Sequence, residues 1–241
     1  VPCFQGQCAQ DWPDFVGAES GSSTINAEDY EADPADESSI FGCDLWLEVT
    51  ATSSPPGGGC DEQLDLMLVL DRSGSINLAE LATLKAGANA FVTALAPTDP
   101  GVHIGQVSFS STSTLDAHLT GNEAALHAAI NALVSGGFTN LAAGIWSATG
   151  ELDNDNGDPH DRPLVDDVMV VITDGAPNRP TSTPIGQALG AQAADDARAV
   201  GIEIFVVGVG VSSSTETYLI SNIADDAAHY FLASDFADLQ T

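Results

Sequence analysis

Short apolar runs alternate with longer amphipathic segments from Leu64 to the end of the chain. The short runs are typical of β-strands, and the longer segments, whose apolar residues recur every three or four positions, are typical of α-helices. This alternation predicts an α/β fold in which a mostly parallel sheet is covered by helices on both faces. We expect strands at 64–70, 103–109, 115–119, 168–173, 202–209 and 228–232, and helices at 78–95, 122–133, 141–151, 185–200 and 215–224.

Residues 1–60 have a different character. They contain no Lys or Arg, carry an acidic stretch at 28–37 and end in the Ser-, Pro- and Gly-rich linker 53–59. One alternating run, 45–49, is typical of a strand. We therefore predict two parts: a small acidic β and loop appendage with its linker at 1–60, and one α/β domain at 61–241.

All four cysteines, Cys3, Cys8, Cys43 and Cys60, lie in the appendage. Their even number suits two disulfides and an oxidising compartment. Three pairings are possible, and proximity favours Cys3 with Cys8 and Cys43 with Cys60. The chain begins at Val1 and has no apolar run near the roughly 20 residues that span a membrane. We expect a mature or excised part of a secreted or cell-surface protein.

The charge of the chain is strongly negative: 35 acidic residues face five basic ones, for a formal net charge of −30. Such a chain would be repelled by nucleic acid and by anionic membrane surfaces. The acidity is best interpreted as a solvated surface adapted to salt or to solubility. The alternative is cation attraction, and the expected setting is a prokaryotic, marine or otherwise saline exterior.

Oxygen-bearing side chains stand where two expected strands end. Asp71, Ser73 and Ser75 follow the first strand, Asp174 follows the strand at 168–173, and Thr139 lies in a Gly-Gly-Phe-Thr turn. Open α/β sheets bind ligands at this carboxyl edge. An all-oxygen donor set suits Mg²⁺, Ca²⁺ or Mn²⁺ rather than zinc, for which Cys or His would be expected. Because most of these donors are uncharged, the ion would still attract an anionic group from outside.

Each segment also has a simpler interpretation. Ser75 could cap the helix that begins near Asn77, Thr139 could cap the helix at 141–151, and Asp174 with Gly175 could form an ordinary turn. Their joint occurrence at strand ends favours the metal site over three unrelated caps and turns.

The three segments, Asp-x-Ser-x-Ser, Gly-Gly-x-Thr and Thr-Asp-Gly, resemble the metal-ion-dependent adhesion site of von Willebrand factor A domains, as in integrin inserted domains. The resemblance covers most of the chain and implies a Rossmann-like, doubly wound sheet. It implies that Ser73, Ser75 and Thr139 ligate the metal directly or through water, and that Asp71 and Asp174 hold the site through direct or water-mediated contacts.

Two further segments of the domain carry recognisable patterns. Residues 235–239 resemble the start of the family's final helix, which the chain end would truncate. A second acidic cluster, with Asp153, Asp155 and Asp158 followed by Asp161, superficially resembles a calcium loop. Its Gly position and the lack of a closing Glu fail the EF-hand spacing, so a solvated loop is favoured over a second Ca²⁺ site.

The sequence contains no nucleophile elbow, no phosphate loop and no His-Glu-x-x-His motif, so we do not expect an enzyme. We expect an extracellular adhesion or assembly module that binds an Asp, Glu or chain-terminal carboxylate of a protein partner through the metal ion. Loops at 110–114, 136–140 and 176–184 would select that partner. The alternatives are a structural subunit or tip of a cell-surface filament and, less favoured, an accessory subunit of a metal-inserting enzyme complex.

Overall fold

The computed structural model of the chain describes residues 63–153, 160 and 162–240. The chain divides into two compact units, Val1–Asp61 and Glu62–Thr241, and the described residues belong to the second. The predictions for the appendage, including its strand and both disulfides, therefore lie outside the described residues. The same holds for Asp155, Asp158 and Asp161 of the candidate calcium loop.

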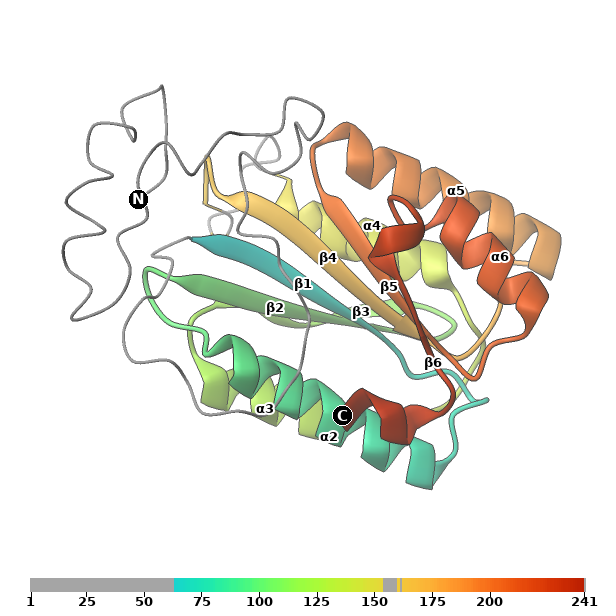
Figure 1. The fold of residues 1–241 in the computed structure, drawn as a ribbon, viewed down its shortest axis with the longest axis horizontal. Helices are drawn as coiled ribbons and strands as arrows, with labels where there is room; N and C mark the ends of the chain where they lie inside the picture. The colour runs from blue at the N-terminus through green and yellow to red at the C-terminus, as the bar shows by residue number, and fades with distance from the viewer. Residues whose placement is uncertain (1–62, 154–159, 161, 241) are drawn as a thin grey trace, which may run out of the picture. The chain divides into compact units, whose positions relative to one another are not determined.

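The described residues form a six-stranded sheet in the order β3-β2-β1-β4-β5-β6 (Figure 1). Every neighbouring pair is parallel except β2 and β3, which are antiparallel. The predicted α/β fold with a mostly parallel sheet is thus confirmed. The strands are β1 (Leu64–Asp71), β2 (Val102–Phe109), β3 (Ser113–Thr120), β4 (Asp166–Thr173), β5 (Glu203–Val209) and β6 (Tyr230–Ala233).

Helices cover both faces of this sheet (Figure 1). Alternate residues of β1 point to opposite faces, as strand geometry requires, so Met67 and Leu68 belong to two different apolar clusters. One cluster includes residues of α4, α5 and α6, and the other includes residues of α2, α3 and η6. The helices are α2 (Leu78–Leu95), α3 (Glu123–Ala132), α4 (Leu141–Leu152), α5 (Thr183–Ala199) and α6 (Ser213–Asn222), with the 3₁₀ helices η5 (Ala227–His229) and η6 (Phe236–Gln240).

The last described residues lie where the resemblance implied the start of a final helix. They form the 3₁₀ helix η6, in which Phe236 is buried against the α2 face of the sheet. The Asp238 carboxylate accepts a hydrogen bond from the Ser234 backbone N–H, and the Asp235 carboxylate accepts one from the Ala237 N–H. These local side-chain bonds, which Asp favours near turns, accompany the tighter winding of this short segment.

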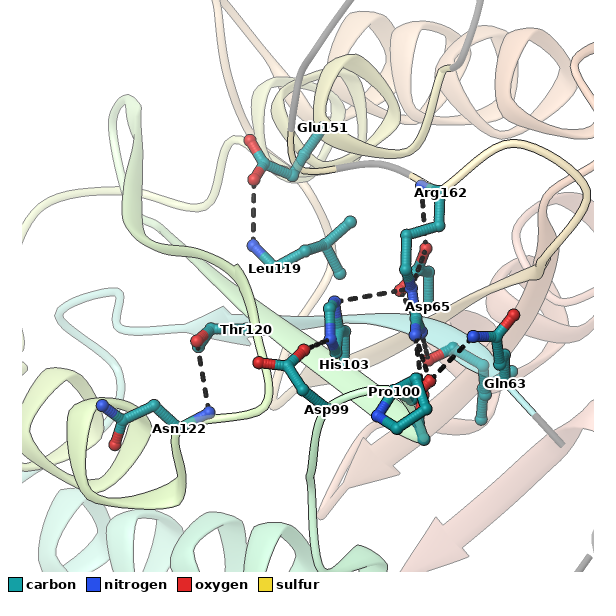
Figure 2. A network of polar contacts seen from close by, with 12 residues as sticks. Gln63, Asp65, Asp99, Pro100, His103, Leu119, Thr120, Asn122, Glu151 and Arg162 are labelled. Atoms are coloured by element: carbon teal, nitrogen blue, oxygen red, sulfur yellow. Dashed lines mark hydrogen bonds and ion pairs between the residues drawn. The ribbon is translucent and has the colours of Figure 1, made fainter. Parts of the chain in front are cut away.

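A buried ion pair lies at the amino end of β1 (Figure 2). The Asp65 side chain is fully buried, and the Arg162 guanidinium reaches it with Nη2 2.7 Å from Oδ1. Arg162 also donates to the backbone carbonyls of Leu64, Pro100 and Gly101. Its own backbone N–H donates to Asp65 Oδ2 at 3.1 Å. The segment before β4 is therefore fastened to the amino edge of the sheet.

The first prediction concerns this pair. Arg162→Met should lower the free energy of unfolding by about 3–5 kcal/mol, because the buried Asp65 carboxylate would lose its charged partner. Urea denaturation of the full chain would measure the change. Lys85→Met is the matched control: the partly exposed Lys85 donates to the Asn131 carbonyl, and its loss should cost less than about 1 kcal/mol. Equal effects of the two variants would contradict the role of the pair.

Candidate metal centre

The two central strands, β1 and β4, place Asp71 and Asp174 at the carboxyl edge of the sheet. β1 and β4 are parallel neighbours, with Leu70 opposite Ile172, so the residues that follow them emerge side by side. The Thr173 hydroxyl donates to Asp71 Oδ2 at 2.7 Å and joins the two strand ends. Asp71 is fully buried, whereas Asp174 is partly exposed.

The turn after β1 links four of the five predicted site residues. The Ser73 backbone N–H donates to Asp71 Oδ1 at 2.8 Å. The Ser73 and Ser75 hydroxyl oxygens lie 2.9 Å apart, and the Ser75 hydroxyl donates to Asp174 Oδ1 at 3.0 Å. Two carboxylates and two hydroxyls are thereby held in one hydrogen-bonded group at the edge of the sheet.

Thr139, the fifth predicted residue, is buried and reaches this group through the backbone of its loop. The Gly74 N–H donates to the Gly137 carbonyl at 3.0 Å, which docks the Thr139 loop onto the serine turn. Gly137 has a φ of +87°, and a Cβ there would lie 2.8 Å from the Ser111 hydroxyl. Glycine is therefore needed at this position both for the backbone conformation and for the close approach.

Asn178 is a residue of the site region that the sequence pattern did not single out. Its side-chain Oδ1 accepts from the Thr139 N–H at 3.1 Å, and its own N–H donates to the Thr139 carbonyl at 2.9 Å. The loop after β4 is thus paired with the Thr139 loop. Thr173, which supplies the hydroxyl to Asp71, belongs to the Thr-Asp-Gly segment but is not among the five predicted ligands.

The structure also bears on the simpler interpretations of two motif residues. Asn77, rather than Ser75, caps α2, because its side chain accepts from the backbone N–H groups of Ala79 and Glu80. Asn140, rather than Thr139, is the N-cap of α4. Ser75 and Thr139 are therefore not required as helix caps.

Negative charge accumulates at the site. Burial raises the pKa of Asp71 to about 7, and the charge of Asp174 also raises it, against hydrogen bonds from Thr173 and Ser73. Burial likewise raises the pKa of Asp174, against the hydrogen bond from Ser75. Ionising both carboxylates is thus unfavourable without added positive charge. The residues fit a hard divalent cation, because their donors are carboxylate and hydroxyl oxygens and a cation would offset this cost.

An aromatic and cationic pair borders the site. The Arg179 guanidinium carbon lies 3.5 Å from the centroid of the Phe138 ring, and Phe138 is half exposed. Phe138 precedes Thr139, and Arg179 follows Asn178 in the chain, so the pair lies on the two loops that are joined by their backbones. It offers an exposed ring and a positive charge next to the oxygen cluster.

Comparison with known families agrees with this arrangement. The family model described as von Willebrand factor type A domain matches residues 65–241. The chain belongs to this family. The predicted resemblance is confirmed, and the VWA domain accounts for the whole described sheet with its helices.

Human Matrilin-1 is 29% identical to the chain over 209 residues, which cover 80% of the chain and 39% of Matrilin-1. Mouse Matrilin-1 is 30% identical over 174 residues, which cover 69% of the chain and 32% of that protein. The chain therefore spans less than half the length of these relatives. The rest of each Matrilin-1 chain has no counterpart in these alignments.

Solved structures share the VWA fold. The vWF domain of the type V pili tip protein Mfa5 from Porphyromonas gingivalis has a TM-score of 0.64 at 16% identity, covering 76% of this chain and 93% of that one. Proximal thread matrix protein 1 from the mussel byssus, described with a zinc-occupied MIDAS motif, has a TM-score of 0.62 at 20% identity, covering 75% and 46%. At these identities the similarity shows the fold alone.

The second prediction tests metal binding at this centre. Mg²⁺ should raise the melting temperature of the full chain, since a ligand bound only by the native state stabilises it by about 2.7 kcal/mol at a hundredfold excess over Kd. Asp174→Asn should weaken Mg²⁺ binding at least about tenfold in calorimetry, because it removes one carboxylate. Asp196→Asn, an exposed carboxylate bonded to Trp146, is the control and should bind as the parent does. A wild-type affinity in Asp174→Asn would exclude this centre.

Proposed function

We propose that this VWA domain is an extracellular adhesion or assembly module. In this proposal Asp71, Ser73, Ser75, Thr139 and Asp174 hold a divalent cation that accepts a carboxylate from a protein partner. The supporting observation is the hydrogen-bonded group of two carboxylates and two hydroxyls at the carboxyl edge of the sheet.

The carboxylates and the hydroxyls would contribute differently to metal binding. Asp71 and Asp174 supply the charge that attracts the cation, and the hydroxyls of Ser73, Ser75 and Thr139 supply neutral oxygens. The bound cation would supply a Lewis-acidic position for an oxygen of the partner. We propose Mg²⁺ as the resident ion, with Ca²⁺ and Mn²⁺ as alternatives, because the donor set has only hard oxygens. The zinc described for the mussel protein makes Zn²⁺ a necessary competitor in any assay.

Partner choice would lie with the three loops at 110–114, 136–140 and 176–184. Arg179 and Phe138 on two of these loops present a cation and an aromatic ring beside the oxygen cluster. Because the chain has only five basic residues, a positive charge at this rim is a local exception that favours an acidic partner. A partner segment with an acidic residue next to an apolar residue could contact both Arg179 and Phe138.

The relatives support an adhesive or assembly role outside the cell. Besides the pili tip protein and the byssal thread protein, the fold is shared with the pilus adhesin SpaC from Lactobacillus rhamnosus GG, at a TM-score of 0.62 and 17% identity. Within the described part of the chain, every helix is too short or too polar to cross a bilayer. A non-enzymatic role remains our expectation.

The second candidate function is that of a structural subunit or tip of a cell-surface filament. It is favoured by the repeated appearance of pilus components among the solved structures of this fold. In that role the carboxylate would come from a neighbouring subunit rather than from a foreign surface. Electron microscopy of native material would distinguish filaments from a separate adhesin.

The third prediction tests the metal bridge. On an array of peptides that carry either Glu and Asp or the matching Gln and Asn, the full chain should bind only acidic peptides, and only in Mg²⁺ without EDTA. Thr139→Ala should reduce this binding, because it removes a hydroxyl ligand and leaves the backbone bonds to Asn178 possible. Asp196→Asn again serves as the matched control. Binding that survives EDTA would mean that no metal ion carries the contact.

A further inference from the structure

Two histidines and a glutamate converge at the sheet edge opposite Asp71. His118 comes from β3, Glu151 from the last turn of α4, and His160 from the segment that leads into β4. One ligand atom of each lies within 4.8 Å of the ligand atoms of the other two. Residues far apart in the sequence thus bring two imidazoles and one carboxylate together.

Glu151 is the anchor of this group. Its side chain is only 2% exposed, although it carries a carboxylate. Its Oε1 accepts from the Leu119 backbone N–H at 3.0 Å, a bond drawn in Figure 2. Glu151 also contacts His118, whose Nδ1 lies 3.0 Å from Oε1 and 3.1 Å from Oε2. Glu151 thus brings a buried carboxylate into contact with an imidazole, and both groups are ligand types of transition-metal sites.

The two imidazoles lie against each other beside this carboxylate. Their ring centroids are 4.0 Å apart and the rings are nearly parallel, with an interplanar angle of 17°. Imidazole nitrogen is a common metal ligand, and the stacked pair places two such donors beside one carboxylate. The side chain of His118 is 55% exposed and therefore has room to turn its Nδ1 from the carboxylate to a metal ion.

The hydrogen bond from the Leu119 backbone holds the Glu151 carboxylate in position for a metal ion. The Leu119 N–H occupies Oε1, so Oε2 is the oxygen directed to a metal when His118 releases it. A backbone donor that fixes a ligating carboxylate is a common support of metal sites. The support is in place before any metal is bound.

The group is separate from the site at Asp71. β3 is antiparallel to β2, with Thr120 opposite Ile104, so His118 lies near the amino end of the parallel strands. α4 starts beside Thr139 and ends at Leu152, and a helix of 12 residues spans about 18 Å. The donors also differ, because imidazole nitrogen suits Zn²⁺, Cu²⁺, Ni²⁺ and Co²⁺, whereas Mg²⁺ prefers oxygen alone.

We propose that His118, Glu151 and His160 form a second metal site, which binds a divalent transition-metal ion such as Zn²⁺. Three protein ligands leave one position of a tetrahedral ion for water. The ion joins β3, α4 and the segment before β4, and so stabilises the folded domain. This proposal is independent of the adhesion function.

The test uses Cu²⁺ as a spectroscopic probe on the full chain with Mg²⁺ in excess. Electron paramagnetic resonance should show nitrogen coupling from two imidazoles. The coupling should persist in Asp174→Asn, whose site offers oxygens only, and should be lost in His118→Ala combined with His160→Ala. Zn²⁺ calorimetry should show affinity at least about tenfold weaker for His160→Ala and for Glu151→Gln.

The controls are His127→Ala and His229→Ala. His127 contacts Glu123 and Thr93 on the other face, and His229 belongs to a second group with Glu203 and Asp225. Neither change should alter the copper spectrum or the zinc affinity. The proposal is overturned if the nitrogen coupling survives the double variant or disappears with His229. Because His160 and His118 are not fully buried, these variants should fold, and a melting curve without metal would verify it.

Discussion

The whole arrangement depends on the parallel pairing of β1 with β4. Their register, with Leu70 opposite Ile172, makes the two strands end together and sets Asp71 beside Thr173 and Asp174. A slip of one residue in β1 would turn the Asp71 side chain to the other face of the sheet. The helices on both faces oppose such a slip, because residues 66–70 of β1 alternate between the two apolar clusters.

β1 carries a fully buried aspartate near each end, and the two aspartates have different partners. At the amino end, Arg162 supplies the opposite charge for Asp65. At the carboxyl end, Asp71 receives hydrogen bonds from Thr173 and Ser73, while Asp174 adds further negative charge. One aspartate is therefore paired with a cation of the chain itself, whereas the cation proposed for the other would come from solution. This contrast between two similar residues supports binding at Asp71 and a purely structural role for Asp65.

Much of the fold could be predicted from the sequence, because central strands and amphipathic helices leave a periodic signal. The α/β class and the positions of nearly all elements follow from it, although the expected strand at 228–232 begins as η5 before β6. The predicted ligands came from short motifs, and the geometry places four of them in one bonded group; their binding of metal stays a prediction. Asn178 and Arg162 could not be predicted, because each acts on a residue far away in the sequence, Thr139 and Asp65, and no local pattern encodes such pairing.

The two edge strands have a consequence for how such a chain could polymerise. β3 carries mostly polar, partly exposed residues and a shift in its register with β2, and β6 has only four residues. Short, polar or irregular margins discourage the addition of a strand from another molecule. The edges of the described sheet therefore favour assembly through loops and side chains, and contacts of that kind would respond to ions and chelators in a way that continuous backbone ladders between molecules do not.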